Sequence, residues 1–243
     1  MSDNSLDMVI GAGSAIGHAL IERWSREGSR PVLAVARSEA SLAAVGALGV
    51  QTRHCDYSEA ALATFAAKLQ ERTADITRLV ICNGVLQGEG YRPERALNQL
   101  ATSAMQQVFE VNTFLPMRVL ASLAPVLKRS TAPRIAVLSA RVGSIGDNGL
   151  GGWYSYRMSK AALNMFIRNL SIEWGRKAPG SVVVAQHPGT TDTGLSEPFQ
   201  AGIAEGKLYT SEQTAERLVE VMRGLSWEQN GRLLHWDGSV IPF

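Results

Sequence analysis

Cysteine is scarce in this sequence, and the two that occur are isolated from each other. Cys55 and Cys82 form no CxxC pair within the 243 residues. A secreted disulfide scaffold uses more cysteines, so we expect two reduced thiols in a reducing cytoplasm. The 4 histidines are spread along the chain without metal-ligand spacing. We therefore expect no metal site.

An excess of charge and a long apolar run are also missing. The 24 basic residues nearly balance the 22 acidic ones, for a net charge of +2. A nucleic-acid binder usually shows a basic stripe, so we expect no nucleic-acid partner. No apolar run approaches the length that crosses a bilayer. The polar start Met1–Asp7 has no positively charged lead into an apolar stretch, which favours a cytoplasmic protein with no membrane partner.

Short apolar runs alternate with longer amphipathic stretches along the whole chain. The short runs predict strands at Met8–Ile10, Pro31–Ala36, Val50–His54, Leu79–Cys82, Ile135–Leu138, Val182–Ala185 and Arg232–Trp236. The longer ones predict helices at Ile16–Ser29, Ser58–Arg72, Leu97–Arg129, Trp153–Arg176 and Thr210–Ser226. Because the strands are apolar on both faces, this pattern predicts a doubly wound parallel sheet between two helical layers. The length suits one such α/β domain over residues 1–243.

A glycine-rich turn follows the first predicted strand and leads directly into a helix. It runs through Gly11, Ala12, Gly13, Ser14, Ala15, Ile16 and Gly17. Glycine lets the backbone turn sharply and approach a pyrophosphate, whose charge the free N–H groups of the helix then hold. Taken by themselves, the glycines are also compatible with a plain tight turn between a strand and a helix. Their place at the start of an α/β pattern favours a dinucleotide site of the Rossmann type.

The residue that follows the second predicted strand helps to determine which cofactor is bound, and here it is a basic side chain. An acid there accepts a hydrogen bond from the adenosine ribose, whereas an arginine pairs with a 2′-phosphate. This sequence has Arg37 and Ser38 and no acid. We predict that NADP(H) is favoured over NAD(H), with Arg37 as the phosphate clamp and Ser38 or Ser14 assisting.

Tyr156 and Lys160 stand four residues apart on a predicted helix. Residues at this spacing share one face. A free tyrosine has a pKa near 10 and is a poor acid or base at neutral pH, but a neighbouring cation favours the phenolate. The pair therefore indicates acid–base chemistry, although a surface Tyr–Lys pair has the same spacing.

Taken together, the sequence resembles the short-chain dehydrogenase/reductase family over essentially its whole length. The glycine turn, Asp56, Asn83-Gly84, Asn112, the Tyr156/Lys160 pair and Pro188-Gly189 occur in family order. Within the family the sequence is similar to the branch of C-factor-like signalling proteins and sniffer-type carbonyl reductases. The residues that carry this likeness are Val142–Ile145, Gly152–Arg157 and Asp237-Gly238.

The resemblance implies roles for these residues. Tyr156 would exchange a proton with the oxygen of a carbonyl or alcohol substrate, Lys160 would lower the pKa of Tyr156 and hold the nicotinamide ribose, and Asn112 would anchor a proton-relaying water. The adenosine side would be bound by Asp56, Tyr57, Asn83 and Gly84. The nicotinamide end would be bound by Pro188, Gly189, Thr191 and Thr193. The long helices in the family pack between subunits, which implies a homodimer or homotetramer.

The sequence departs from the family pattern at three places. Ala15 replaces the middle glycine of the turn, which is tolerable where φ stays negative. Ile81 and Cys82 remove two polar side chains from the family's Asn-Asn-Ala-Gly. Ala140 stands where the family has the serine that hydrogen-bonds the substrate.

The missing serine leaves the catalytic assignment open. Neighbouring side chains on an extended strand point to opposite faces, so Ser139 could replace a serine at position 140 only through a local twist of the strand. Ser144 is a second candidate for this hydroxyl donor. We assign Ser139 to the catalytic set and note Arg141 as a further group near the carbonyl. The loop Thr190–Lys207 is expected to act as a substrate-selecting lid.

Two functions fit these residues. The first is an NADP(H)-dependent oxidoreductase that transfers hydride to or from a carbonyl or alcohol substrate. The second is a nucleotide-binding signalling or scaffold protein with little or no turnover, which Ala140 and the altered Asn-Asn pair favour. Whether Tyr156→Phe abolishes hydride transfer discriminates between them.

Overall fold

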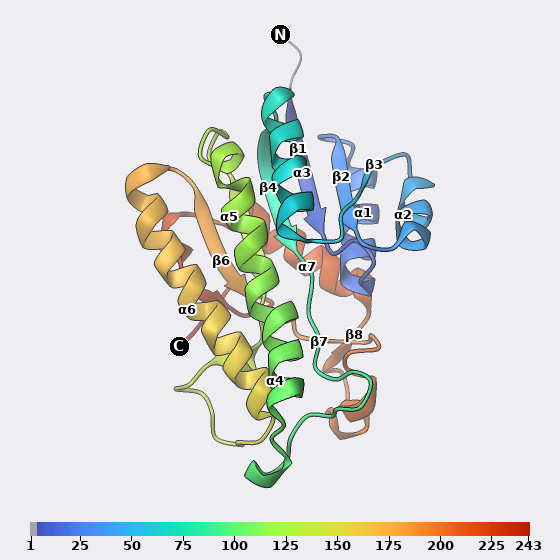
Figure 1. Cartoon of the computed structure of the whole chain (residues 1–243), viewed down its shortest axis with the longest axis vertical. Coiled ribbons are helices and arrows are strands. Elements are labelled where there is room, and N and C mark those ends of the chain that lie inside the picture. Colours follow the sequence, from blue (N-terminus) through green and yellow to red (C-terminus); the bar gives the residue numbers. More distant parts are fainter. Residues whose placement is uncertain (1–3) are drawn as a thin grey trace.

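The computed structural model describes residues 4–243 and contains an eight-stranded sheet between two layers of helices (Figure 1). The strand order is β10-β9-β6-β5-β4-β1-β2-β3. These strands are β1 (Ser5–Ile10), β2 (Val32–Ala36), β3 (Gln51–His54), β4 (Asp75–Ile81), β5 (Arg134–Leu138), β6 (Val182–Gln186), β9 (Leu233–Leu234) and β10 (Val240–Ile241). All neighbours pair in parallel except β9 and β10. A separate parallel pair joins β7 (Thr190–Thr191) to β8 (Leu208–Tyr209).

The helices cover both faces of this sheet. They are α1 (Ala15–Glu27), α2 (Glu39–Gly46), α3 (Glu59–Glu71), α4 (Thr102–Phe109), α5 (Leu115–Leu127), α6 (Tyr154–Lys177) and α7 (Ser211–Gly224). Apolar side chains of α3, α5 and α6 form one core with the sheet, and those of α1, α2 and α7 form the other. Figure 1 shows α5 and α6 in front of the sheet and α7 behind it.

Strand β1 illustrates why the sheet is buried on both sides. Met8 and Ile10 belong to one core and Val9 to the other, and all three are fully buried. Alternate side chains of a strand point to opposite faces, so a continuous apolar run satisfies both cores. The predicted fold class, a doubly wound α/β sheet of the Rossmann type, is confirmed.

The order of the strands creates a crevice at one edge of the sheet. From β1 the chain proceeds outward through β2 and β3, and then returns to β4 on the other side of β1. In open α/β sheets a ligand binds outside the carboxyl ends of the strands at such a reversal. The glycine turn follows β1 and Cys82–Gly84 follow β4, so both lie at this crevice.

The predicted single helix over Leu97–Arg129 is wrong. A 3-10 turn at Leu97–Gln99 precedes α4, and a π-helical turn at Glu110–Phe114 separates α4 from α5. Asn112 in the π turn binds the backbone of Val85 with both side-chain atoms, at 2.8 Å each. A side chain that bonds to a distant backbone in this way favours the wider turn, as π-bulges in helices often do at functional sites.

Helix α2 was not predicted, because its 8 residues are mostly small and show little helical periodicity. The remaining predicted helices and strands occur, with ends that differ by a few residues.

Apolar side chains remain exposed on α6, where Met158, Met165 and Ile172 repeat every seven residues. This spacing places them on one face of the helix. Self-association as a homodimer or homotetramer stays a prediction. Within residues 4–243, no helix combines the length and the apolar character that crossing a membrane requires.

Candidate active site

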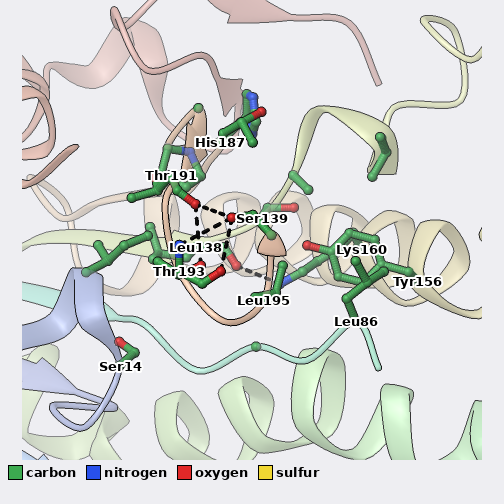
Figure 2. Close-up of a pocket in the computed structure, with 18 of the residues that line it drawn as sticks. Ser14, Leu86, Leu138, Ser139, Tyr156, Lys160, His187, Thr191, Thr193 and Leu195 are labelled. Atoms are coloured by element: carbon green, nitrogen blue, oxygen red, sulfur yellow. Dashed lines mark hydrogen bonds between the residues drawn. The ribbon is translucent and has the colours of Figure 1, made fainter. Parts of the chain in front are cut away.

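A cavity of about 380 Å³ lies at the carboxyl ends of β1, β4, β5 and β6. Most of the predicted site residues meet there, on several different elements. Those that line it are Ser14, Ala15, Ile16, Asn83, Gly84, Ser139, Tyr156, Lys160, Pro188, Gly189, Thr191 and Thr193. Figure 2 shows Tyr156 and Lys160 on one side of this cavity, Ser14 on another, and Thr191 and Thr193 between them.

The glycine turn is required by its contact with the end of β4. Gly11 has φ of +83°, and a Cβ added to it would lie 2.9 Å from Asn83 Oδ1. A Cβ on Gly17 would lie 2.5 Å from the carbonyl oxygen of Gly11. Side chains cannot be accommodated at such distances, so only glycine lets the two segments approach. Gly13 leaves room for the side chain of Ser41 in the same way.

Ser14 connects the turn to the first turn of α1. Its hydroxyl donates to the carbonyl oxygen of Gly11 (2.9 Å) and accepts from the N–H of Gly17 (3.0 Å). Ala15 begins α1 and is absent from the residues with positive φ. Its methyl group is therefore tolerated in place of the usual glycine, as expected. The N-terminus of α1 faces the cavity and offers free N–H groups to an anion.

Tyr57 lies beneath the glycine turn, where its side chain is buried. It is 2% exposed, and its hydroxyl accepts from the N–H of Gly11 and donates to the carbonyl oxygen of Val35, both at 3.2 Å. Burial raises the pKa of Tyr57 to about 12. A role for Tyr57 in cofactor binding would therefore act through the shape of the turn.

The other predicted adenosine-side residues lie outside this cavity. Arg37 and Ser38 follow β2 and are exposed. Ser38 caps α2, since its hydroxyl accepts from the N–H of Ser41. Asp56 is exposed, and hydrogen bonds from Ser58 hold the pKa of its carboxyl below the usual value. Their roles in binding the adenosine side of a nucleotide stay predictions.

Tyr156 and Lys160 lie one helical turn apart at the start of α6, where both are almost fully buried. The Lys160 ammonium donates to the carbonyl oxygen of Leu138 (2.9 Å), and Nζ lies 5.9 Å from the centre of the Tyr156 ring. The bond to Leu138 is one of the dashed lines in Figure 2. The predicted pair therefore shares one cavity with the glycine turn.

Burial dominates the electrostatics of this pair. It raises the pKa of Tyr156 and lowers the pKa of Lys160 to about 7. A low-dielectric environment disfavours the charged form of each group. Tyr156 is therefore protonated at neutral pH in the protein without a ligand. A charged Lys160 is expected to lower the Tyr156 pKa, and burial acts in the opposite direction.

Asn112 is completely buried behind the pair. Besides its two bonds to Val85, its amide donates to Ser159 Oγ (3.1 Å) on α6. A Cβ added to Gly84 would lie 3.6 Å from Asn112 Oδ1 and 3.7 Å from Lys160 Nζ. Asn112 thus ties the bend between α4 and α5 to α6. Its role in a proton relay stays a prediction.

The neighbouring hydroxyl groups are occupied by structural bonds. Ser139 is buried and donates to Asn164 Oδ1 (2.7 Å). Ser144 donates to the carbonyl oxygen of Pro242 and accepts from the N–H of Asp147. Arg141 pairs with Asp147 in the same loop. Ser139 would have to release Asn164 before it could donate to a substrate, so its catalytic role stays a prediction.

Sequence reasoning missed the apolar wall of the cavity. Leu86, Ala140 and Tyr156 form a small cluster, against which Val142, Trp153, Leu195 and Phe199 pack. Leu195 and Phe199 belong to the predicted lid; both line the cavity, and Phe199 lies in a 3-10 turn at Glu197–Gly202. His187 also lines the cavity. Its position directly before Pro188, a predicted site residue, could have indicated that His187 lies at the cavity.

No metal centre emerges from the side chains of residues 4–243, because no three or more His, Cys, Asp or Glu residues are grouped to hold an ion. The cavity does bring together the Tyr156 phenol, the Lys160 ammonium and the N-terminus of α1. This set can hold an anionic nucleotide and exchange a proton with a substrate oxygen.

The sequence matches the family model described as short chain dehydrogenase over residues 7–204, and the chain belongs to this family. A curated relative from Rhodococcus sp. (strain AD45), 1-hydroxy-2-glutathionyl-2-methyl-3-butene dehydrogenase, is 30% identical over 97% of this chain and 98% of its own. C-signal of Myxococcus xanthus is 32% identical over 61% of this chain and 84% of its own.

Solved structures share the fold at lower identity. The carbonyl reductase Sniffer of D. melanogaster has a TM-score of 0.83 at 19% identity and 99% coverage of both chains. The NADPH-bound carbonyl reductase from chicken fatty liver has a TM-score of 0.78 at 23% identity and the same coverage. The predicted resemblance to the short-chain dehydrogenase/reductase family is confirmed.

The buried ammonium of Lys160 predicts a pH-dependent stability. Its pKa is about 7 in the folded protein and near 10.5 in the unfolded chain. Between these values the unfolded chain binds more protons, so stability rises with pH from about 7 to 10.5. Lys160→Met should therefore be more stable than the parent at pH 6, and the difference in unfolding free energy should shrink by about 3 kcal/mol when the pH is raised to 9.5. Urea unfolding at both pH values measures the margin. The exposed Lys68→Met is the control, and a margin independent of pH would contradict the prediction.

Proposed function

We propose that this protein is an NADP(H)-dependent oxidoreductase that transfers hydride between the nicotinamide and a carbonyl or alcohol substrate. The observation that carries this proposal is the shared cavity. The phenol of Tyr156 and the ammonium of Lys160 open into the same space as the glycine turn and the N-terminus of α1. A nucleotide held by the turn would therefore extend toward Tyr156, which lines the same cavity.

The residues of the turn fit a dinucleotide. Gly11 lets the turn fold closely against Asn83, and Asn83 Oδ1 is buried without a hydrogen-bond partner among the described residues. The N–H groups at the start of α1 would hold the pyrophosphate. Pro188, Gly189, Thr191 and Thr193 line the far side of the cavity and would hold the nicotinamide end. When bound, the nicotinamide supplies or accepts the hydride.

Tyr156 and Lys160 would carry the proton chemistry. In reduction, Tyr156 donates its phenolic proton to the carbonyl oxygen as the carbon receives hydride, and in oxidation it takes the proton back. Burial keeps that proton on Tyr156 at neutral pH, which suits the reductive direction. A nearby anionic nucleotide would favour the charged form of Lys160. The Lys160 ammonium would in turn lower the pKa of Tyr156.

NADP(H) is the proposed cofactor because Arg37 is available to a 2′-phosphate. Arg37 is exposed at the end of β2, and no ion pair recorded among residues 4–243 involves it. The NADPH-bound carbonyl reductase of the same fold supports this choice.

A second candidate function is nucleotide binding with little or no turnover. Ala140 removes the usual hydroxyl donor beside Tyr156, which favours low turnover. The name of the relative C-signal suggests a signalling role for that protein. This candidate requires that nucleotide binds while Tyr156 has no effect on hydride transfer.

Substitution of Tyr156 by Phe tests the proposed function. Because general acid–base catalysis contributes about 10²–10⁴-fold, Tyr156→Phe should reduce kcat for carbonyl reduction by that order and leave the Kd for NADPH within about twofold. NADPH oxidation with a panel of aldehydes, ketones and quinones gives kcat, and fluorescence titration gives Kd. Tyr154→Phe, two residues earlier on α6 and outside the cavity lining, is the matched control. Equal rates for Tyr156→Phe and the parent would favour the binding protein.

Substitution of Arg37 tests the cofactor preference. Arg37→Ala removes the partner of a 2′-phosphate and should weaken NADPH binding about tenfold or more, with little change for NADH. Titration calorimetry with both nucleotides gives the ratio of the two Kd values. Arg72→Ala, an exposed arginine at the end of α3, should leave this ratio unchanged. An unchanged ratio in Arg37→Ala would exclude Arg37 as the clamp.

Ala140 offers a gain-of-function test. A serine there would place a second hydroxyl beside Tyr156, and one such donor changes kcat by about 10²–10³ in a site built for it. Ala140→Ser should therefore raise kcat roughly tenfold or more, whereas Ser139→Ala should leave kcat nearly unchanged because the Ser139 hydroxyl is engaged with Asn164. A large loss in Ser139→Ala with no gain in Ala140→Ser would reassign the donor to Ser139.

A further inference from the structure

Trp153 adopts a backbone conformation that a bulky residue rarely takes. Its φ of 50° and ψ of 44° lie in the left-handed region, directly before α6. Gly151 and Gly152, which precede it, also have positive φ, and neither carries a side chain that this conformation would strain. A non-glycine residue held in this region points to a local function, because the surroundings must compensate for the strain.

Glu94 holds this turn from one side. Its backbone carbonyl accepts from the N–H of Trp153 (2.5 Å), and its carboxylate accepts from both the N–H and the hydroxyl of Ser155. Glu94 is 4% exposed, so a buried carboxylate occupies the N-terminus of α6, where the helix dipole favours negative charge. These bonds fix where α6 begins.

Arg157 holds the turn from the other side. Its Nε donates to the carbonyl oxygens of Gly151 (3.1 Å) and Gly152 (3.0 Å), and its Nη1 donates to that of Val142 (3.3 Å). Glu94 therefore binds the N–H side of the turn and Arg157 binds its carbonyl oxygens. The conformation of Trp153 is determined from two directions.

The result is an indole placed between the proposed acid and the lid. The Trp153 ring lies edge-on to the Tyr156 ring, at 6.3 Å between centroids, and 5.0 Å from the ring of Phe199. Leu86 and Leu195 belong to the same cluster, and Figure 2 shows both beside Tyr156 and Lys160. A substrate oxygen at the Tyr156 hydroxyl would carry its substituent along this apolar wall.

We propose that Trp153 is a specificity-determining residue that selects carbonyl substrates with a flat aromatic substituent, and that Glu94 is the positioning residue that holds it. This proposal rests on the reductase function proposed above. Aromatic rings prefer edge-to-face or offset contacts with one another, which Trp153 and Phe199 offer together. A polar substituent would lose its hydration against this wall without gaining a hydrogen-bond partner.

Two aldehydes of similar size test the proposal. Benzaldehyde has a flat ring and cyclohexanecarbaldehyde a puckered one, and the ratio of their kcat/KM values is compared between variants so that intrinsic reactivity cancels. Trp153→Gly suits the left-handed backbone and should lower the benzaldehyde-to-cyclohexanecarbaldehyde ratio by about threefold to tenfold. Trp153→Phe should restore most of the ratio. Trp227→Gly, which removes a half-exposed tryptophan elsewhere, is the matched control.

Phe199 and Glu94 extend the test. Phe199→Leu should lower the same ratio, and the double variant with Trp153→Gly should lose less than the product of the two effects, because the two rings are in contact. Glu94→Ala should raise KM for benzaldehyde more than it lowers kcat, and Glu94→Gln should retain most of the parent ratio. A merely structural role for Glu94 would change the two aldehydes equally.

The outcomes separate this inference from the proposed function. Turnover of both aldehydes with a ratio unaffected by Trp153→Gly and Phe199→Leu would overturn the inference and leave the reductase intact. Absence of turnover with either aldehyde, while NADPH still binds, would overturn the proposed function together with the inference. A lowered ratio in Trp153→Gly, restored in Trp153→Phe, supports both.

Discussion

The close approach of the β1 and β4 carboxyl ends is the constraint on which the site depends. Gly11 meets Asn83 at a distance that excludes any side chain, and Tyr57 supports the turn from below. This contact aims the N-terminus of α1 into the crevice where the strand order reverses. A side chain at Gly11 would separate the two strand ends and move the N-terminus of α1 away from the crevice.

The second half of the site depends on burial around α6. The π turn at Asn112 brings the bend between α4 and α5 against α6, and the bonds to Asn112 reach both Val85 and Ser159. Tyr156 and Lys160 are thereby desolvated, which keeps the phenol protonated and makes the ammonium costly. The same enclosure that keeps Tyr156 protonated leaves Lys160 with its pKa close to neutral pH.

Local patterns were sufficient for the sheet, the glycine turn and the Tyr156–Lys160 pair, because each is encoded within a few neighbouring residues. The break between α4 and α5 was not predictable in this way, since it depends on a bond from Asn112 to Val85, 27 positions away in the sequence. The inward orientation of Tyr57 depends likewise on Gly11 and Val35. The apolar wall draws on Leu86, Trp153 and Phe199 from three separate segments, and no sequence window contains them together.

The central claim is that one cavity brings a nicotinamide and a substrate oxygen to Tyr156. Incubation with NADPH deuterated at nicotinamide C4 and an excess of aldehyde, followed by mass spectrometry of the products, tests it most directly. The account predicts an alcohol that carries deuterium on the former carbonyl carbon and NADP⁺ in equal amount. Bound NADPH that keeps its deuterium, with no labelled alcohol, would contradict it.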